Sequence, residues 1–150
     1  MSSQEFRYIV RIAGTDIDGK LKTAYGLAEI KGVGYNLAVA LCRMLGIDPE
    51  KRIGFLTDTE IRKIEAALED PKKVGIQPWM LNRRKDYETG EDKHLIGADL
   101  IFVVRQDIER EKRIKSWRGI RHALGLKVRG QRTRTTGRTG ITVGVKRKRK

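Results

Sequence analysis

The 150-residue chain is poor in the residues that build covalent or metal-based sites. Its single cysteine, Cys42, excludes an internal disulfide and a zinc site made of several cysteines, and a small buried side chain is the expected role. A P-loop is excluded because Gly-Lys-Ser/Thr is missing, and a Rossmann fingerprint lacks its third glycine. No Ser–His–Asp grouping, paired carboxylates or metal-ligand spacing stands above chance. We therefore expect no catalysis, no cofactor and no metal.

Long hydrophobic runs are also missing. The longest apolar stretch, Leu95–Val104, contains Asp99 and is far too short to span a bilayer. The first residues lack the basic start and apolar stretch of a signal peptide. These absences predict a soluble, intracellular protein that has no membrane partner.

Acidic residues are absent from one end of the chain. Lys112–Lys150 hold fifteen Lys and Arg and no Asp or Glu, whereas residues 1–111 carry 18 basic and 19 acidic residues. The net charge of +14 is thus a local polycation, and the common cellular polyanion is nucleic acid. The last aromatic residue is Trp117, so the tail must act mainly through phosphate and shape. The alternatives are a merely solvated tail and, for Lys146–Lys150, a nuclear localisation signal.

The hydrophobic pattern predicts a mainly α-helical fold. A strand or arm is expected over Phe6–Ile12, followed by a turn at Gly14, Asp16, Asp18 and Gly19. Helices are expected over 20–29 and 35–45, and Asp48-Pro49 should open a brief helical turn. The second helix should end at Gly46 and bury a face made of Leu37, Ala38, Leu41, Met44 and Leu45.

The next helix has the clearest start signal. Thr57 and Glu60 form a capping box, with Leu56 and Ile61 at the staple positions, and Asp70-Pro71 ends the helix. A surface β-hairpin with Gly90 in its turn is expected over 85–95.

A long helix is expected over about 98–116, with an apolar face of Ile101, Val104 and Ile108. Hydrophobic periodicity ends at Gly125, which predicts a helical domain over 1–125 and an extended basic tail over 126–150.

Two segments are candidate nucleic-acid sites. The Gly32-Val33-Gly34 hairpin between two helices is similar to helix-hairpin-helix and helix-two-turn-helix elements, which offer backbone N–H groups to phosphate; alternatively it only turns the chain. Arg118 and Arg121 lie one helical turn apart, and further arginines follow with Gln131 and Thr133. Beside cations, His122 suits a neutral hydrogen-bond partner, and His94 is expected at the surface.

These residues carry a family resemblance. Arg118-Gly119-x-Arg121-His122-x-x-Gly125-x-x-Val128-Arg129-Gly130-Gln131 resembles the signature of the thirteenth small-subunit ribosomal protein family. Arg132-Thr133-Arg134-Thr135 continues that pattern, and Arg11-Ile12-Ala13-Gly14 resembles the family's N-terminal arm. The segment Pro78–Arg83 and the following hairpin look like the insertion of archaeal and eukaryotic members. With the chain length, this favours an archaeal protein.

The resemblance implies a cytoplasmic, non-enzymatic constituent of the small ribosomal subunit head. The implied partners are small-subunit rRNA, the nineteenth small-subunit protein, the fifth large-subunit protein across the subunit interface, and peptidyl-site tRNA. The implied rRNA-binding residues are Gly32, Gly34, Arg118, Arg121, His122, Arg129, Gln131, Arg132, Arg134 and Arg138. The residues nearest tRNA would be Lys146, Arg147, Lys148, Arg149 and Lys150.

Two other functions compete with this one. The first is a DNA-binding module, because helix-two-turn-helix elements also occur in DNA-repair glycosylases, although these usually need a cysteine zinc finger that the single Cys42 cannot supply. The other is a free-standing RNA chaperone.

Overall fold

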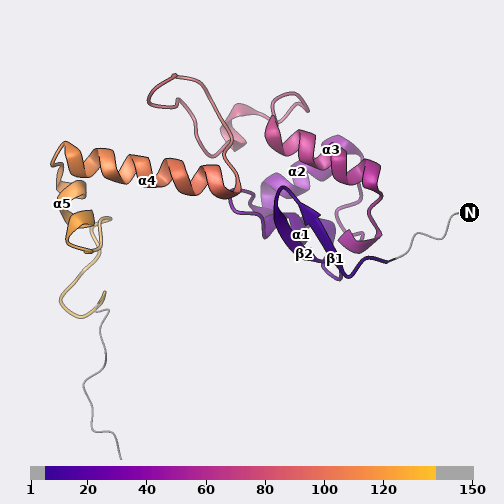
Figure 1. Ribbon diagram of the computed structural model, residues 1–150, viewed down its shortest axis with the longest axis horizontal. Coiled ribbons are helices and arrows are strands. Elements are labelled where there is room, and N and C mark those ends of the chain that lie inside the picture. The colour runs from indigo at the N-terminus through magenta and orange to yellow at the C-terminus, as the bar shows by residue number, and fades with distance from the viewer. Residues whose placement is uncertain (1–5, 138–150) are drawn as a thin grey trace, which may run out of the picture. The chain divides into compact units, whose positions relative to one another are not determined.

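The computed structural model describes residues 6–137 and is mainly α-helical, as predicted (Figure 1). Its contacts divide the chain into two compact units, one up to Phe102 and one from Val103 onward. The division falls inside helix α4 (Gly97–Arg113), and each unit is described by itself. No described helix combines the length and the apolar character that a bilayer crossing requires.

The first unit begins with a β-hairpin. Strands β1 (Ile9–Ile12) and β2 (Thr15–Asp18) pair antiparallel, with Ile12 opposite Thr15. The turn is therefore only Ala13-Gly14, and both residues have positive φ, as tight hairpin turns require. The predicted turn was too long, because Asp16 and Asp18 belong to β2. Alternation along the strands buries Val10, Ile12 and Ile17.

Three helices complete the core of this unit: α1 (Thr23–Ala28), α2 (Tyr35–Leu45) and α3 (Asp58–Glu69). α1 packs on α2 and β2, and α3 packs on α2 and β1. The predicted bounds of α2 are confirmed, and Gly46 ends the helix with a φ of 69°. The prediction of a buried Met44 is wrong: it is 54% exposed, because Cys42 and Leu41 complete the inward stripe and leave Met44 at its edge.

The capping box of α3 is confirmed. The Thr57 N–H donates to Glu60 Oε2 at 2.7 Å, and the Glu60 N–H donates to Thr57 Oγ1 at 3.2 Å. Leu56 and Ile61 are both buried, and the helix ends at Asp70 before Pro71. Asp48-Pro49 forms a turn and not a helical segment, and the Asp48 carboxylate accepts the Glu50 N–H at 2.9 Å. Short 3-10 helices follow at η1 (Ile53–Phe55) and η2 (Pro78–Met80).

The hairpin expected over 85–95 forms only in part. Its base closes through a single antiparallel bridge between Arg83 and Lys93, but no strands extend from it. Side chains replace the missing ladder: the Asp86 carboxylate accepts hydrogen bonds from Arg83 Nε at 2.5 Å and Lys93 Nζ at 3.0 Å. Gly90 takes positive φ at the tip, as expected of a turn glycine.

The long helix predicted over about 98–116 is α4, which ends three residues before Ser116, and a separate short helix follows it. α4 ends at Arg113, Lys115 has a φ of 54°, and α5 (Trp117–Ala123) begins. Ser116 caps α5, since its Oγ accepts the Gly119 N–H at 3.0 Å. The apolar face predicted for α4 is partly exposed: Ile101 is 37% and Val104 46% exposed.

The cap of α3 gives a first prediction. Thr57→Ala removes an acceptor for a helix N–H and should lower the free energy of unfolding by about 1 kcal/mol. Thr57→Ser keeps the hydroxyl and is the matched control, which should stay close to the original protein. Guanidinium unfolding curves measure both. Equal stability of the alanine and serine variants would contradict the role of the cap.

Glu60 adds a pH-dependent term. Partial burial opposes its ionisation, but hydrogen bonds from the Thr57 backbone and hydroxyl, together with the nearby Lys51, hold the pKa of Glu60 below its ordinary value. A lowered folded-state pKa stabilises the protein above the ordinary value of 4.5, and this stability is lost as the pH falls below it. Glu60→Gln should therefore flatten the unfolding free energy between pH 6 and about pH 3. If thermal melts show the same pH dependence of stability in the variant and the original protein, the ionisation of Glu60 does not contribute to it.

Candidate nucleic-acid interface

Helix α5 presents the first arginines of the predicted site. Arg118 is exposed, whereas Arg121 and His122 are half-buried on the same short helix. The helix sits tightly against the end of α4, because a Cβ on Gly119 would lie 2.0 Å from the Glu111 carbonyl oxygen. Only glycine fits this contact, which brings the start of α5 close to the end of α4.

Arg121 joins α5 to the tail. Its Nε donates to the Lys127 carbonyl oxygen at 2.5 Å, and its guanidinium carbon lies 5.6 Å from the centre of the Trp117 ring. The Leu126 N–H also donates to the Arg121 carbonyl oxygen at 2.9 Å. Sequence spacing predicted a phosphate fork for Arg121. The structure adds an anchoring role that only the path of the following chain could reveal.

The tail follows a bent course through residue 137. Gly125, Gly130 and Gly137 have positive φ, as does no non-glycine residue of this stretch. The Gln131 side-chain carbonyl accepts the Arg129 N–H at 2.9 Å, and the Thr136 hydroxyl donates to the Arg132 carbonyl oxygen. Gln131 therefore shapes its own chain. The exposed side chains along this course include Arg129, Arg132 and Arg134.

No carboxylate belongs to this segment. From Lys112 to Arg134 the sequence has nine cations and no Asp or Glu. The carboxylate that directly precedes it in sequence, Glu111, is engaged by the Ser116 hydroxyl. The segment thus presents guanidinium groups with no carboxylate of its own to neutralise them, and such groups suit the phosphates of a nucleic acid.

The two candidate glycines lie in the first unit and have different environments. Gly32 has a φ of 100°, and a Cβ there would lie 2.3 Å from the Leu95 carbonyl oxygen, so this glycine is required for packing. Gly34 is exposed, a Cβ there would have no neighbouring atom within 4 Å, and it is the N-cap of α2 without a side-chain cap. Of the pair, Gly34 is the one whose helix start is open to a phosphate.

The candidate residues fall into separate parts of the structure. Arg118, Arg121, His122, Arg129, Gln131, Arg132 and Arg134 share the α5–tail segment, whereas Gly32 and Gly34 belong to the other unit. Arg138 and Lys146–Lys150 lie outside the described residues.

His94 is not the surface histidine that was expected. It is half-buried, its Nδ1 accepts the Asn82 N–H at 3.4 Å, and its Nε2 is buried without a hydrogen-bond partner among the described residues. Burial lowers the pKa of His94. The loop path that buries it depends on Asn82, whose side chain bonds both backbone groups of Leu95, at 2.6 and 2.9 Å.

Cys42 is buried, as predicted, and burial raises the pKa of its thiol to about 11. It is therefore a protonated core side chain and not a nucleophile. Within residues 6–137, no group of three His, Cys, Asp or Glu is placed to hold a metal ion.

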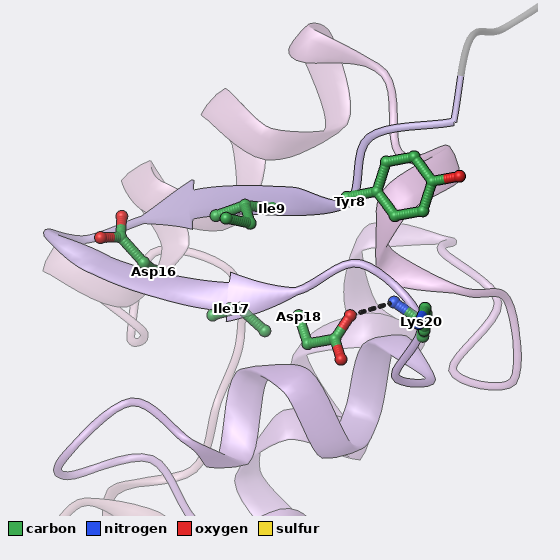
Figure 2. Close-up of a pocket in the computed structure, with 6 residues that line it drawn as sticks. All are labelled: Tyr8, Ile9, Asp16, Ile17, Asp18 and Lys20. Atoms are coloured by element: carbon green, nitrogen blue, oxygen red, sulfur yellow. Dashed lines mark hydrogen bonds between the residues drawn. The ribbon is translucent and has the colours of Figure 1, made fainter.

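A hollow of about 370 Å³ lies beside the hairpin (Figure 2). It is lined by Tyr8, Ile9, Asp16, Ile17, Asp18 and Lys20. Its two carboxylates disfavour phosphate, and Asp18 accepts the Lys20 backbone N–H at 2.9 Å. The hollow is thus a poor nucleic-acid site, and the α5–tail segment is the better one.

Comparison with known proteins decides the family. The family model described as ribosomal protein S13/S18 matches residues 11–139, which include both candidate glycines and the arginine-rich segment. The chain belongs to this family. A ribosomal protein of this kind is a structural component and not an enzyme, as predicted.

Individual relatives are similar to the chain over almost its whole length. The small ribosomal subunit protein uS13 of Staphylothermus marinus is 74% identical over 149 residues, which cover 99% of each chain. The proteins of the same name from Hyperthermus butylicus and Methanocaldococcus jannaschii are 71% and 53% identical over 150 residues. These organisms are archaea, which confirms the archaeal character predicted from the insertion.

The two glycines provide the third prediction. Gly32→Ala places a Cβ against the Leu95 carbonyl oxygen at a positive φ, so it should lower the free energy of unfolding by about 1–3 kcal/mol. Gly34→Ala meets no atom and should cost less than about 1 kcal/mol. Thermal melts compare the pair. Equal destabilisation of both variants would contradict the assigned difference.

Proposed function

We propose that the protein is a structural constituent of the small ribosomal subunit that binds small-subunit rRNA through α5 and the basic tail. The observation that carries this proposal is the exposure of Arg118, Arg129 and Arg132 on a segment without any carboxylate of its own. Each guanidinium can bind a phosphate through two parallel hydrogen bonds.

Binding of this kind is architectural. The Arg121–Lys127 contact and the Ser116 cap hold the start of the tail in place before RNA binds, so less chain entropy is lost on association. Counterion release from the RNA supplies the sequence-independent part of the affinity. The tail then holds neighbouring rRNA segments together by neutralising their phosphates.

The finer partners follow from the family resemblance. We infer that the protein neighbours the nineteenth small-subunit protein and the fifth large-subunit protein, and that Lys146–Lys150 lie nearest peptidyl-site tRNA. The hollow beside the hairpin supports a protein neighbour there, because its carboxylates, Asp16 and Asp18, offset the cations Arg11 and Lys20 and leave no positive excess for phosphate. The α2 start at Gly34 is proposed as a further phosphate contact.

The fourth prediction concerns salt dependence. The triple variant Arg118→Gln, Arg129→Gln, Arg132→Gln should reduce the slope of log K against log salt by about 2 to 3, since each phosphate contact contributes roughly 0.7–0.9. The probe is a small-subunit rRNA head fragment in filter-binding titrations.

The matched control removes the same charge elsewhere. Lys20→Gln, Lys63→Gln, Lys72→Gln changes three exposed lysines of the first unit and should leave the slope nearly unchanged. An equal effect of both triple variants would mean that net charge alone governs binding. An unaltered slope in the arginine variant would exclude the α5–tail segment as the rRNA site.

A further inference from the structure

Trp117 is the most exposed large apolar residue of the described part of the second unit. It begins α5 and is 71% exposed, although an indole ring buries readily in a protein core. Ile120, at position i+3 of the same helix, is 45% exposed, and Leu124, the C-cap residue at position i+7, is 67% exposed. Helical spacing places the three on one side of α5, so they form an uncovered apolar strip.

The Trp117 ring is held by a cation on one of its faces. The Arg121 guanidinium lies 5.6 Å from the ring centre and is itself fixed by the Lys127 carbonyl oxygen. This arrangement restrains the indole while most of its surface stays accessible. A restrained ring costs less entropy when a flat ligand stacks on it.

The charge around the ring selects the kind of ligand. Lys115 and Arg118 flank Trp117 in sequence, and Glu111, the carboxylate that precedes them, is engaged by the Ser116 hydroxyl. A protein partner would need an acidic surface around an apolar patch. A nucleotide of an RNA strand meets both requirements in one unit, because the faces of its base are apolar and its phosphate is anionic.

We propose that Trp117 is a stacking platform for one unpaired nucleobase of the bound rRNA, with Arg121 positioning the ring. The inference rests on the proposed rRNA binding and deepens it. The sequence predicted that the tail acts through phosphate and shape. Trp117, at the entrance to that tail, adds a contact to a base face, which the neighbouring Arg118 supports by binding the adjacent phosphate.

Trp79 provides a matched internal control. It is 67% exposed in η2, so its accessibility equals that of Trp117 within a few per cent. It lies, however, in the first unit, where Lys73 and Arg83, on either side of it in sequence, are paired with Asp70 and Asp86. Base stacking driven by local cations should therefore select Trp117 over Trp79.

The first measurement is fluorescence of single-tryptophan proteins. Trp79→Phe leaves only Trp117, and Trp117→Phe leaves only Trp79. On titration with an rRNA fragment that contains unpaired bases, the emission of Trp117 should be strongly quenched and that of Trp79 nearly unchanged. A fully paired RNA duplex should still bind through phosphates but leave the Trp117 emission unquenched. Equal quenching of both tryptophans, or quenching of Trp79 alone, overturns the proposal.

The second measurement is affinity at fixed salt. Trp117→Leu keeps an apolar side chain without an aromatic face and should weaken binding about tenfold, while Trp117→Phe should retain most of the affinity. Both variants should leave the salt slope unchanged, because no phosphate contact is removed. Since the ring is exposed, circular dichroism should show an intact fold.

The outcomes separate this inference from the proposed function. If Trp117→Leu binds RNA like the original protein while the arginine variant loses salt slope, stacking is wrong and rRNA binding through arginines stands. If the original protein shows no salt-dependent binding to the fragment, the proposed function itself fails. If Trp117→Leu binds RNA normally but enters reconstituted small subunits poorly, the strip faces a protein, and the stacking proposal is likewise overturned.

Discussion

Like-charge repulsion is the constraint under which the second unit is built. Nine cations and no carboxylate between Lys112 and Arg134 mean that ion pairs within that stretch cannot set the course of the chain. Neutral devices set it instead. The Ser116 hydroxyl caps α5, Gly119 permits close approach to the Glu111 carbonyl, and the Gln131 amide holds the Arg129 backbone. A stretch of cations that has no anions of its own is suited to an external polyanion.

In the first unit, by contrast, several charged side chains pair with one another. Arg7 lies 2.6 Å from Asp58, and Asp86 accepts hydrogen bonds from Arg83, Lys93 and Thr89. The hydrogen bond from Arg83, followed by that from Lys93, holds the pKa of Asp86 well below its usual range. Ion pairs therefore fasten loops of the first unit, whereas glycine, hydrogen bonds and the Arg121 guanidinium shape the stretch from Lys112 to Arg134. The sequence shows the same contrast: residues 1–111 are nearly neutral, whereas Lys112–Lys150 contain no acidic residue.

Local signals in the sequence predicted local structure well. The capping box at Thr57 and the left-handed Gly46 involve groups within a few residues, so spacing alone revealed them. The errors have a non-local origin. The burial of His94 depends on a loop whose path Asn82 sets by bonding the Leu95 backbone, and no pattern near His94 encodes that contact. The rRNA contact expected of Gly32 stays a prediction, and the structure adds a packing role, since a Cβ there would meet the Leu95 carbonyl oxygen.

The lack of carboxylates in the second unit's cationic stretch also explains why arginine, and not lysine, predominates from Arg118 to Arg134. Arg121 uses one side chain for two tasks, since its Nε bonds the Lys127 carbonyl while its planar guanidinium covers the Trp117 ring. A lysine ammonium is a point charge and has no planar group with which to do both. In a segment that has no carboxylate, a cation that also organises its neighbours replaces the missing ion pairs. The charge that binds phosphate is thus also the chemistry that shapes the chain, so shape and affinity cannot be changed independently at Arg121.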